Sequence, residues 1–429
     1  SVWIIRRKLI DARPFGTALV AMANQNPFIE RYAKAFGRPQ ATLLKITGLS
    51  SAEVSGERHL VRTADGQEWT DFGSFGVHLL GHNHPEVKRA ISQASEELGL
   101  STRILGNLAA TELAEVLASS VPWELDSVMM ANSGSEAVEI ALRMSMIATG
   151  RTKVLCLKGG YHGKSFATSV LSGAYASDRI PVCLEVTKVS AGDYGALRTA
   201  LQTEAFATFI AEPVQGEGGI VPVDTDFLSL AAELCGQTGT KFVLDEIQTG
   251  LGRTGVSWAG CGVTTGVDAV LTGKVLGGGY VPIAAAIFDS KSFGSQATDP
   301  ILHSSSFSGG TLAARVAIAA VNTATNKAFL NRVNELSILA QDCFDKWADQ
   351  ATFPIAFRRH GLMMGIELDS PERAGQFIIE AIKENLLLTF CLANPRVIRI
   401  YPPGVISDGE MDNALDRLGK ALARVETLR

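Results

Sequence analysis

The chain has 429 residues, of which 46% are hydrophobic and 19% are charged, a composition that predicts a globular protein of two to three domains with a large buried core. The net charge of -5 comes from 39 basic and 44 acidic residues without a basic stripe. This balance argues against nucleic acid and against a membrane surface as partners, and favours a small-molecule ligand.

The cysteines and the first residues of the chain indicate the cellular compartment in which the protein is expected. Six cysteines lie far apart, without the spacing of a zinc site or of a disulfide framework, so a reducing cytoplasm is expected. The start, SVWIIRRKLIDARPFG, has too short an apolar run for a signal peptide, and no uninterrupted apolar stretch of about 18 residues follows. Because the chain begins at serine, it is also compatible with a domain of a larger protein.

The predicted elements begin with a hairpin and continue as an alternating series. RHLVRTADGQEWTDF, at 58–72, predicts two strands around the turn Asp65-Gly66. From about residue 108 onward, helical and strand patterns alternate. Helices are predicted at 108–121, 135–150 and 226–239, and strands at 127–132, 153–160, 207–214, 241–247, 268–273 and 282–288. Nearly continuous apolar strands separated by helices indicate a mostly parallel sheet covered on both faces.

The C-terminal part has a different pattern, with the strand-like runs RHGLMMGIEL and RVIRIYPP on either side of a predicted helix at 371–386. We therefore predict an α/β fold with a large domain over residues 80–320. Residues 1–79 and 321–429 are expected to combine into a smaller α+β domain.

Two motifs suggest a dinucleotide site and a metal site, but the residues around each motif do not support that interpretation. GLGRTG, at 250–255, fits a dinucleotide-binding pattern, but it follows the acidic segment DEIQ and no helical pattern comes after it. His82 and His84 in GHNHP suggest a metal, but no carboxylate cluster at ligand spacing accompanies them. A loop before a helix that begins at Pro85 is the preferred interpretation.

Two strand ends carry groups with a possible common chemistry. KFVLDEIQ ends with Asp245, at the end of a strand where parallel sheets bind ligands, although many such aspartates only cap a loop. Lys274 follows the next strand and precedes three glycines in VLTGKVLGGG. An aspartate that keeps a pyridine nitrogen protonated, beside a lysine that forms an imine, is the pair that pyridoxal phosphate (PLP) chemistry needs. The glycines are expected to let backbone and cofactor come together.

Two further strand ends supply groups for such a cofactor. In ANSGSEAVEIAL, a helix begins at Ser133, Gly134 and Ser135, and its first N–H groups and hydroxyls can hold a phosphate; an ordinary helix cap is the alternative. In KVLCLKGGYHGKS, Tyr161 and His162 follow a strand and can face a planar ring; a tyrosine of the core is the alternative.

From GHNHP at 81–85 to IRIYPP at 398–403, the chain resembles the class III, or ω-amino, aminotransferases of PLP fold type I. SGSEA, YHG, EPVQGEGG, DEIQTGLGRTG and GKVLGGG occur in the family's order. The resemblance implies a homodimer with its active site at the subunit interface. It also implies a ping-pong transfer of an amino group through pyridoxamine phosphate.

The resemblance also implies roles for individual residues. Lys274 is expected to be the Schiff-base lysine and to carry the proton between substrate and cofactor, for which it must be neutral. Asp245 is expected to pair with the pyridine nitrogen, Gln248 to lie near the phenolic oxygen, and Tyr161 to stack on the ring. The other residues expected at the cofactor are Ser133, Gly134, Ser135, His162, Glu212 and, from the neighbouring subunit, Ser306.

Glu217, in EPVQGEGG, needs a partner for its charge, and Arg399 in VIRIYPP is the expected one. In part of the family such a pair acts as a gate. The arginine is masked when an ω-amine binds, and is freed to bind the carboxylate of a 2-oxo acid. A plain structural ion pair is the alternative.

The sequence departs from the family at 308–311, where Ser-Gly-Gly-Thr replaces the usual Gly-Gly-Asn-Pro. HLLGHNHP and HSSSF are more similar to the putrescine and polyamine aminotransferases than to the acetylornithine enzymes. The predicted function is PLP-dependent amino-group transfer between an amine, diamine or ω-amino acid and an aldehyde or 2-oxo acid, with 2-oxoglutarate or glutamate as one partner. The alternatives are an aminomutase or a decarboxylase on the same fold, and a non-catalytic scaffold.

Overall fold

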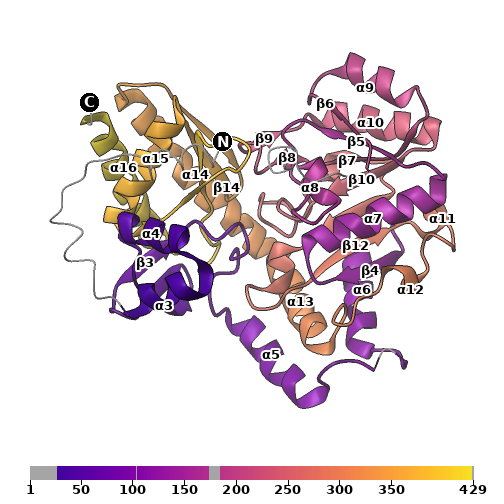
Figure 1. Cartoon of the computed structure of the whole chain (residues 1–429), viewed down its shortest axis with the longest axis horizontal. Coiled ribbons are helices and arrows are strands. Elements are labelled where there is room, and N and C mark those ends of the chain that lie inside the picture. Colours follow the sequence, from indigo (N-terminus) through magenta and orange to yellow (C-terminus); the bar gives the residue numbers. More distant parts are fainter. Residues whose placement is uncertain (1–26, 103, 173–183, 428–429) are drawn as a thin grey trace.

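The computed structural model describes residues 27–102, 104–172 and 184–427. Its central sheet has seven strands in the order β4-β12-β11-β10-β7-β5-β6 (Figure 1). Only β12 is antiparallel to its neighbours. The strands are β4 (Ser127–Ala131), β5 (Lys153–Leu157), β6 (Val186–Val189), β7 (Phe206–Ala211), β10 (Lys241–Asp245), β11 (Ala269–Thr272) and β12 (Ala284–Phe288). The six predicted strands and the mostly parallel sheet are confirmed, and β6 is an additional edge strand.

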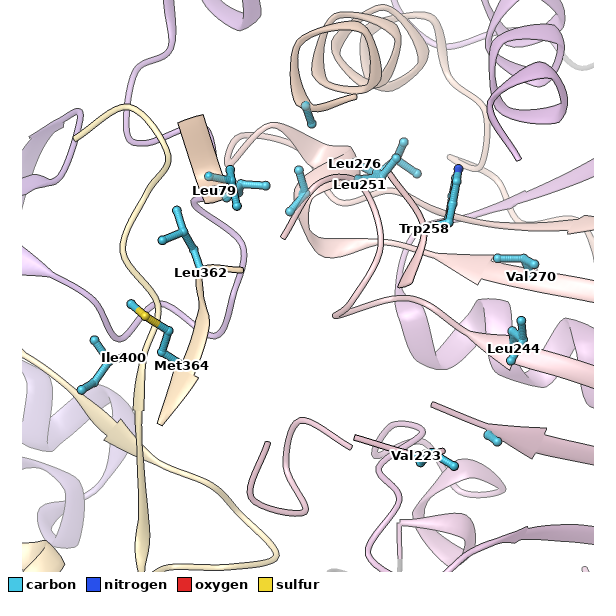
Figure 2. Packing of buried hydrophobic residues seen from close by; sticks show 14 of the residues in the cluster. Leu79, Val223, Leu244, Leu251, Trp258, Val270, Leu276, Leu362, Met364 and Ile400 are labelled. Atoms are coloured by element: carbon cyan, nitrogen blue, oxygen red, sulfur yellow. The ribbon is translucent and has the colours of Figure 1, made fainter. Parts of the chain in front are cut away.

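Both faces of this sheet are buried, as the apolar strands predict. Along β10, Val243 packs into the cluster beneath helix α7 (Gly134–Thr149), while Phe242 and Leu244 pack into the larger cluster on the opposite face. Successive side chains of a strand point to opposite faces, so one strand contributes to both clusters. The larger cluster continues through Leu251 and Leu362 to the C-terminal sheet (Figure 2). One continuous core therefore joins the two parts of the chain.

The ends of the chain meet in two smaller sheets. The predicted hairpin, β2 (Leu60–Thr63) and β3 (Glu68–Asp71), forms a sheet with β1 (Glu53–Glu57) and with β15 (Leu386–Leu387), a strand from the C-terminal part. The other sheet has the order β13-β14-β17-β16. Its strands are β13 (Ile355–His360), β14 (Met363–Leu368), β16 (Thr389–Phe390) and β17 (Val397–Ile400). The pairing of β3 with β15 is the physical link that combines both ends, and it supports the proposed domain division near residues 80 and 320.

The remaining elements are mostly helices (Figure 1), and the two short strands β8 and β9 pair with each other. The helices and short strands are α3 (Pro27–Phe36), α4 (Arg38–Thr47), α5 (Pro85–Glu97), α6 (Leu108–Ser120), α8 (Thr168–Leu171), α9 (Tyr194–Leu201), β8 (Val214–Gln215), β9 (Val221–Pro222), α10 (Thr225–Thr238), α11 (Ser290–Phe293), α12 (Pro300–His303), α13 (Thr311–Ala324), α14 (Lys327–Gln350), α15 (Pro371–Lys383) and α16 (Asp408–Thr427). No helix in the described ranges is both long and apolar enough to span a membrane.

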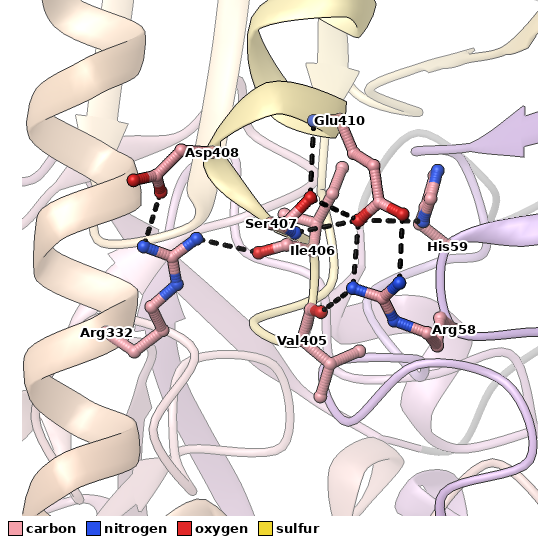
Figure 3. Close-up of polar contacts among 8 residues, drawn as sticks. All are labelled: Arg58, His59, Arg332, Val405, Ile406, Ser407, Asp408 and Glu410. Carbon is pink, nitrogen blue, oxygen red and sulfur yellow. Dashed lines mark hydrogen bonds and ion pairs between the residues drawn. The ribbon is translucent and has the colours of Figure 1, made fainter.

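A polar cluster holds the start of α16 against the N-terminal hairpin and α14 (Figure 3). Arg58 donates to both carboxylate oxygens of Glu410, at 2.9 and 2.8 Å, and to the carbonyl oxygen of Val405 at 2.9 Å. The backbone N–H and hydroxyl of Ser407 also donate to Glu410, at 2.8 and 2.7 Å. Glu410 thus joins the two ends of the chain with charge-assisted hydrogen bonds.

We expect Glu410→Gln to destabilise the fold at pH 7 by less than about 1 kcal/mol, because Arg58 is partly exposed. Burial opposes the charged form, but the hydrogen bonds from Ser407 and the charges of His59 and Arg58 leave the pKa of Glu410 lowered. A lowered folded-state pKa gives stability above the unfolded-state pKa, which is lost as the pH falls through the folded-state value. Urea unfolding of both proteins should therefore show a difference that shrinks below about pH 4. A difference that does not change with pH contradicts this role.

Candidate active site

A cavity of about 190 Å³ opens at the carboxyl ends of the central strands. It is lined by Ser133, Gly134, Ser135, Tyr161, His162, Gly163, Glu212, Asp245, Ile247, Gln248 and Lys274. These residues follow β4, β5, β7, β10 and β11, because parallel strands bring their carboxyl ends to one edge of the sheet. Nine of the predicted site residues therefore meet in one place, although they come from segments far apart in the sequence.

Lys274 begins the short 3-10 turn η2 (Lys274–Gly277) directly after β11. Its φ of 45° lies in the left-handed region, which is strained for a residue with a side chain and is typical of functional sites. Burial lowers the pKa of the Lys274 amine, against the opposing charges of Glu217, Asp245 and Glu212. The amine therefore loses its proton more readily than an exposed lysine does, as a proton carrier requires.

Two of the glycines after Lys274 allow close packing within the protein. A Cβ atom on Gly279 would lie 2.7 Å from Nδ1 of His78, and one on Gly278 would lie 2.9 Å from a methyl group of Val87. Protein side chains occupy the space beside these two glycines. Gly278 and Gly279 thus let the turn pack against the loop before α5 and the start of α5, whereas the expectation that the glycines admit the cofactor stays a prediction.

Asp245 and His162 form a buried pair that lines the cavity. Nδ1 of His162 lies 2.7 Å from Oδ2 of Asp245, and the other carboxylate oxygen accepts the backbone N–H of Ile247 at 3.1 Å. The imidazole holds the carboxylate in one orientation, and Nε2 of His162 is buried without a hydrogen-bond partner in the described part of the chain. His162 therefore acts on Asp245, a contact that the sequence did not indicate.

The start of α7 forms one end of the cavity. Ser133 is the N-cap, and its hydroxyl oxygen accepts the backbone N–H of Glu136 at 3.2 Å. The hydroxyl oxygen of Ser135 accepts the backbone N–H of Lys164 at 3.2 Å. The helix-cap interpretation of Ser133 is confirmed, and Ser133, Gly134 and Ser135 all line the cavity, while phosphate binding by this segment stays a prediction.

Glu212 is buried beside Asp245 and His162. The pKa of Glu212 is raised to about 7, mainly by burial and also by the charge of Asp245, against the opposing effect of His162. The carboxylate accepts the backbone N–H groups of Tyr161 at 2.9 Å and Gly216 at 3.2 Å. Those two bonds fix the segment that carries Tyr161, so Glu212 shapes the cavity wall by holding backbone.

The expected ion pair between Glu217 and Arg399 is present and almost fully buried, with 5% and 1% of the side chains exposed. Glu217 lies in the loop between β8 and β9, and Arg399 lies in β17 of the C-terminal sheet. The guanidinium lies 5.2 Å from the ring of Phe75 and 5.9 Å from that of Tyr401. Sequence analysis named neither aromatic residue. Phe75 lies 324 residues before Arg399, so no local pattern links the two, whereas Tyr401 lies only two residues after Arg399 in IRIYPP.

The family model of class-III aminotransferases matches residues 52–422. The chain belongs to the class-III aminotransferase family. It is therefore an aminotransferase of the α/β fold that PLP-dependent enzymes of fold type I share, as the sequence motifs predicted.

Named relatives cover most of this aminotransferase. An acetylornithine aminotransferase of Methanopyrus kandleri is 33% identical over 372 residues, which are 86% of this chain and 93% of that protein. An aminotransferase of Archaeoglobus fulgidus without an assigned substrate is 27% identical over 396 residues, which are 92% and 93% of the two chains. The similarity is spread over the whole length and is not limited to the motifs.

Solved structures of aminotransferases share the fold. The ornithine aminotransferase of Toxoplasma gondii, whose crystals show partial occupancy of PLP at the active site, has a TM-score of 0.81 and 26% identity, over 94% of this chain and 99% of that one. The N-acetylornithine aminotransferase of Stenotrophomonas maltophilia has a TM-score of 0.76 and 27% identity, over 90% and 100%. A transaminase of the marine bacterium Virgibacillus has a TM-score of 0.86 at 20% identity, over 94% and 99%, and shows likeness of fold alone.

Three predicted residues of the aminotransferase site do not line the cavity: Glu217, Arg399 and Ser306. Ser306 is exposed on the segment between α12 and α13 and does not line the cavity. A role at the site of a neighbouring subunit, as expected from the sequence, stays a prediction. The helix start after this segment is also altered, since Gly310 is the N-cap of α13 without a side-chain cap.

The interpretation of GHNHP needs a correction. Pro85 begins α5 as expected. However, Asp71 at the end of β3 places its Oδ2 2.9 Å from Nε2 of His82, and His78 joins them. A carboxylate does accompany His82, and spacing along the sequence missed it because the loop between β3 and α5 folds back on itself.

The side-chain amide of Gln248, which lines the cavity, packs directly against Gly216. A Cβ atom on Gly216 would lie 1.4 Å from Oε1 of Gln248. We expect Gly216→Ala to displace this amide and to reduce turnover by roughly 10- to 100-fold, with a loss of stability of about 1–3 kcal/mol. Gly236→Ala is the matched control, since it lies in α10 with open space around it and should stabilise the protein slightly. Steady-state rates and urea unfolding measure both effects. Equal turnover in the two variants contradicts a role for Gln248 in the site.

Proposed function

We propose that this aminotransferase binds PLP in the cavity and transfers an amino group from an ω-amino acid of the ornithine type to 2-oxoglutarate. The observation that carries the proposal is the meeting of a lysine amine, a buried carboxylate–imidazole pair and a helix N-terminus around one cavity at the strand ends. PLP, when bound, supplies an aldehyde that condenses with amines and a ring that stabilises negative charge on the neighbouring carbon.

The residues present fit such a cofactor. Nε2 of Gln248 and Nε2 of His162 are both buried and have no hydrogen-bond partner in the ranges that the structure describes. Buried polar atoms of this kind usually have a partner, so these two support the presence of a polar ligand. The N-terminus of α7, with the hydroxyls of Ser133 and Ser135, favours an anion such as the phosphate.

Each of the site residues then has a separate task. Lys274 is the point of covalent attachment and, with its pKa lowered, takes up and returns the substrate proton. Asp245, held by His162, supplies the negative charge that keeps a ring nitrogen protonated. Tyr161 and Gln248 border the space for the ring, and Glu212 holds the backbone of Tyr161.

The substrate proposal rests on Glu217, Arg399 and the relatives. Nε and Nη2 of Arg399 are buried and lack a hydrogen-bond partner within the described ranges, so the guanidinium keeps donors for a second carboxylate. The named relatives include acetylornithine and ornithine aminotransferases, which supports an ω-amino acid over the diamines that the motifs favoured. A 2-oxo acid can displace Glu217 from Arg399 in the second half of the reaction.

We also propose that the active form is a cytoplasmic homodimer. Large apolar side chains are exposed near the segment that carries Ser306: Ile104, Leu105, Leu108, Ile301, Leu302 and Phe307 are 91%, 74%, 69%, 82%, 51% and 68% exposed. An apolar patch of this kind is typical of a protein interface. Burial of this patch against a second copy can bring Ser306 to the partner's cavity.

The experiment is a donor panel assayed with 2-oxoglutarate. Ornithine, N-acetylornithine and putrescine are compared as donors, and the formation of glutamate and of the carbonyl product is followed. We expect an ω-amino acid to give the highest kcat/KM and equal amounts of both products. Carbon dioxide release marks a decarboxylase, isomerised amino acid without glutamate marks a mutase, and absence of any turnover contradicts the proposal.

A further inference from the structure

Three side chains with metal-ligating atoms meet outside the cavity, in the loop between β3 and α5. A carboxylate oxygen of Asp71, a ring nitrogen of His78 and a ring nitrogen of His82 all lie within 4.8 Å of one another. We propose that these three residues bind a divalent cation of the zinc type, as a structural site that supports the turn carrying Lys274.

The donor set determines the class of cation. Two imidazoles and one carboxylate suit zinc and the neighbouring transition metals, whereas calcium and magnesium prefer oxygen ligands only. The 2.9 Å between Nε2 of His82 and Oδ2 of Asp71 is close to the roughly 3.4 Å that two ligands at about 2.1 Å from a tetrahedral ion require. A zinc ion can therefore replace the hydrogen bond between these two atoms if the side chains of Asp71 and His82 move apart by about 0.5 Å.

The carboxylate is held in place by groups that do not coordinate. Asp71 is 6% exposed, its Oδ1 accepts the backbone N–H of Gly73 at 3.0 Å, and the hydroxyl of Ser74 donates to Oδ2. Outer hydrogen bonds of this kind orient ligating carboxylates and strengthen metal binding. Asp71 is therefore oriented before any cation arrives.

The two imidazoles lie face to face, with ring centroids 3.9 Å apart and planes inclined by 32°. A glycine lies beside each of the two rings and leaves space for it. A Cβ atom on Gly56 would lie 2.8 Å from Cγ of His82, and one on Gly279 would lie 2.7 Å from Nδ1 of His78. That nitrogen of His78 is buried and has no hydrogen-bond partner among the residues described.

Arg253 is a positively charged residue close to His78, and its charge opposes the binding of a metal cation at this site. Its guanidinium donates to the carbonyl oxygens of Pro402, Leu362 and Gly76, at 2.9, 3.3 and 3.4 Å. These donors point to backbone, so Arg253 does not occupy the carboxylate oxygens of Asp71. The negative charge of Asp71 offsets part of the repulsion.

The position of the site gives it a structural role. His78 packs against Gly279, which lies just after the turn η2 that begins at Lys274. A cation that joins His78 to Asp71 and His82 ties this turn to β3 and α5 from outside the cavity. Metal binding should therefore raise thermal stability without supplying a reacting group.

Equilibrium dialysis of the holoenzyme against Zn²⁺ tests the proposal, with His78→Leu as the probe variant. The controls are His360→Leu, a histidine in the remote strand β13, and Cys261→Ser, an exposed thiol that can bind zinc adventitiously. We expect one zinc per chain in the wild type and in both controls, and an affinity weaker by at least about 100-fold in His78→Leu. Saturating Zn²⁺ should raise the thermal midpoint of the wild type and leave that of His78→Leu unchanged.

A second variant and a spectroscopic measurement keep the test decisive if His78→Leu folds poorly. His78→Asn keeps a polar group of smaller size, and Co²⁺ bound to two imidazoles and a carboxylate gives a visible absorption band in a difference spectrum. We expect this band in the wild type and its loss in His78→Asn. Absence of stoichiometric binding to the wild type, or equal binding to the His78 variants, overturns the proposal.

Discussion

Replacement of Lys274 by alanine is expected to reduce transamination turnover by roughly 10⁴-fold or more, because both the attachment point and the proton carrier are lost. The fold should tolerate this change. Lysine and alanine both carry a Cβ atom, so the strain of a φ of 45° is similar in the two proteins. The substitution also removes an amine whose charged form is disfavoured by burial. Thermal unfolding should therefore show a midpoint no lower than that of the wild type.

Lys188→Ala is the matched control for this prediction. Lys188 is also partly buried and donates to the carbonyl oxygen of Leu171 at 2.8 Å, but it lies outside the residues that line the cavity. We expect its turnover to stay within about threefold of the wild type, as for a substitution that does not touch the reacting groups. Full activity of Lys274→Ala, or equal losses in the two variants, contradicts the proposed role of Lys274.

Arg399→Met is expected to destabilise the protein by about 3–5 kcal/mol, because it leaves the buried carboxylate of Glu217 without its partner. Glu217 also accepts the backbone N–H of Leu392 at 2.9 Å, so this carboxylate joins two parts of the chain. The double variant Glu217→Gln, Arg399→Met removes both charges, and most of the stability should return. Urea unfolding of the wild type, both single variants and the double variant measures the coupling. Additive losses would show that the two residues act independently.

Arg399→Lys distinguishes two roles of Arg399: a gate that binds the carboxylate of a 2-oxo acid, and a purely structural ion pair with Glu217. Lysine keeps the positive charge beside Glu217 but cannot bind a carboxylate in the bidentate way of a guanidinium. If Arg399 binds the 2-oxo acid, KM for 2-oxoglutarate should rise by about tenfold or more while KM for the amino donor changes little. A fall in stability with both KM values unchanged supports the purely structural role.

Much of the fold followed from local patterns. The strands β7 and β10 are continuous apolar runs bounded by turns and helices, and such runs are stable only between two covering layers. The edge strand β6 was missed because it is short and half-exposed, so its hydrophobic pattern is weak. The predicted ends of β5 and β7, at residues 160 and 214, lie three residues beyond the observed ends at Leu157 and Ala211, because the residues after each strand continue into loops that line the site or are buried.

The site residues that lie at the carboxyl ends of the strands could be predicted from the sequence. Asp245 and Lys274 could be paired from sequence because neighbouring parallel strands bring their carboxyl ends together. The contact between His162 and Asp245 could not, since a hydrogen bond between side chains depends on the spacing of β5 and β10 across β7. The same limit applies to Phe75 beside Arg399, because these two residues converge only after the C-terminal sheet packs against the loop after β3.

The sequence by itself determined the class of fold, the family and the residues available for amino-group transfer, because these depend on local pattern and on residue type. Only the tertiary structure decided that Asp71, His78 and His82 form one cluster and that His78 and Val87 occupy the space beside the glycines after Lys274. Those contacts join segments through side-chain packing across the core, and no periodicity along the chain records which side chain fills which space.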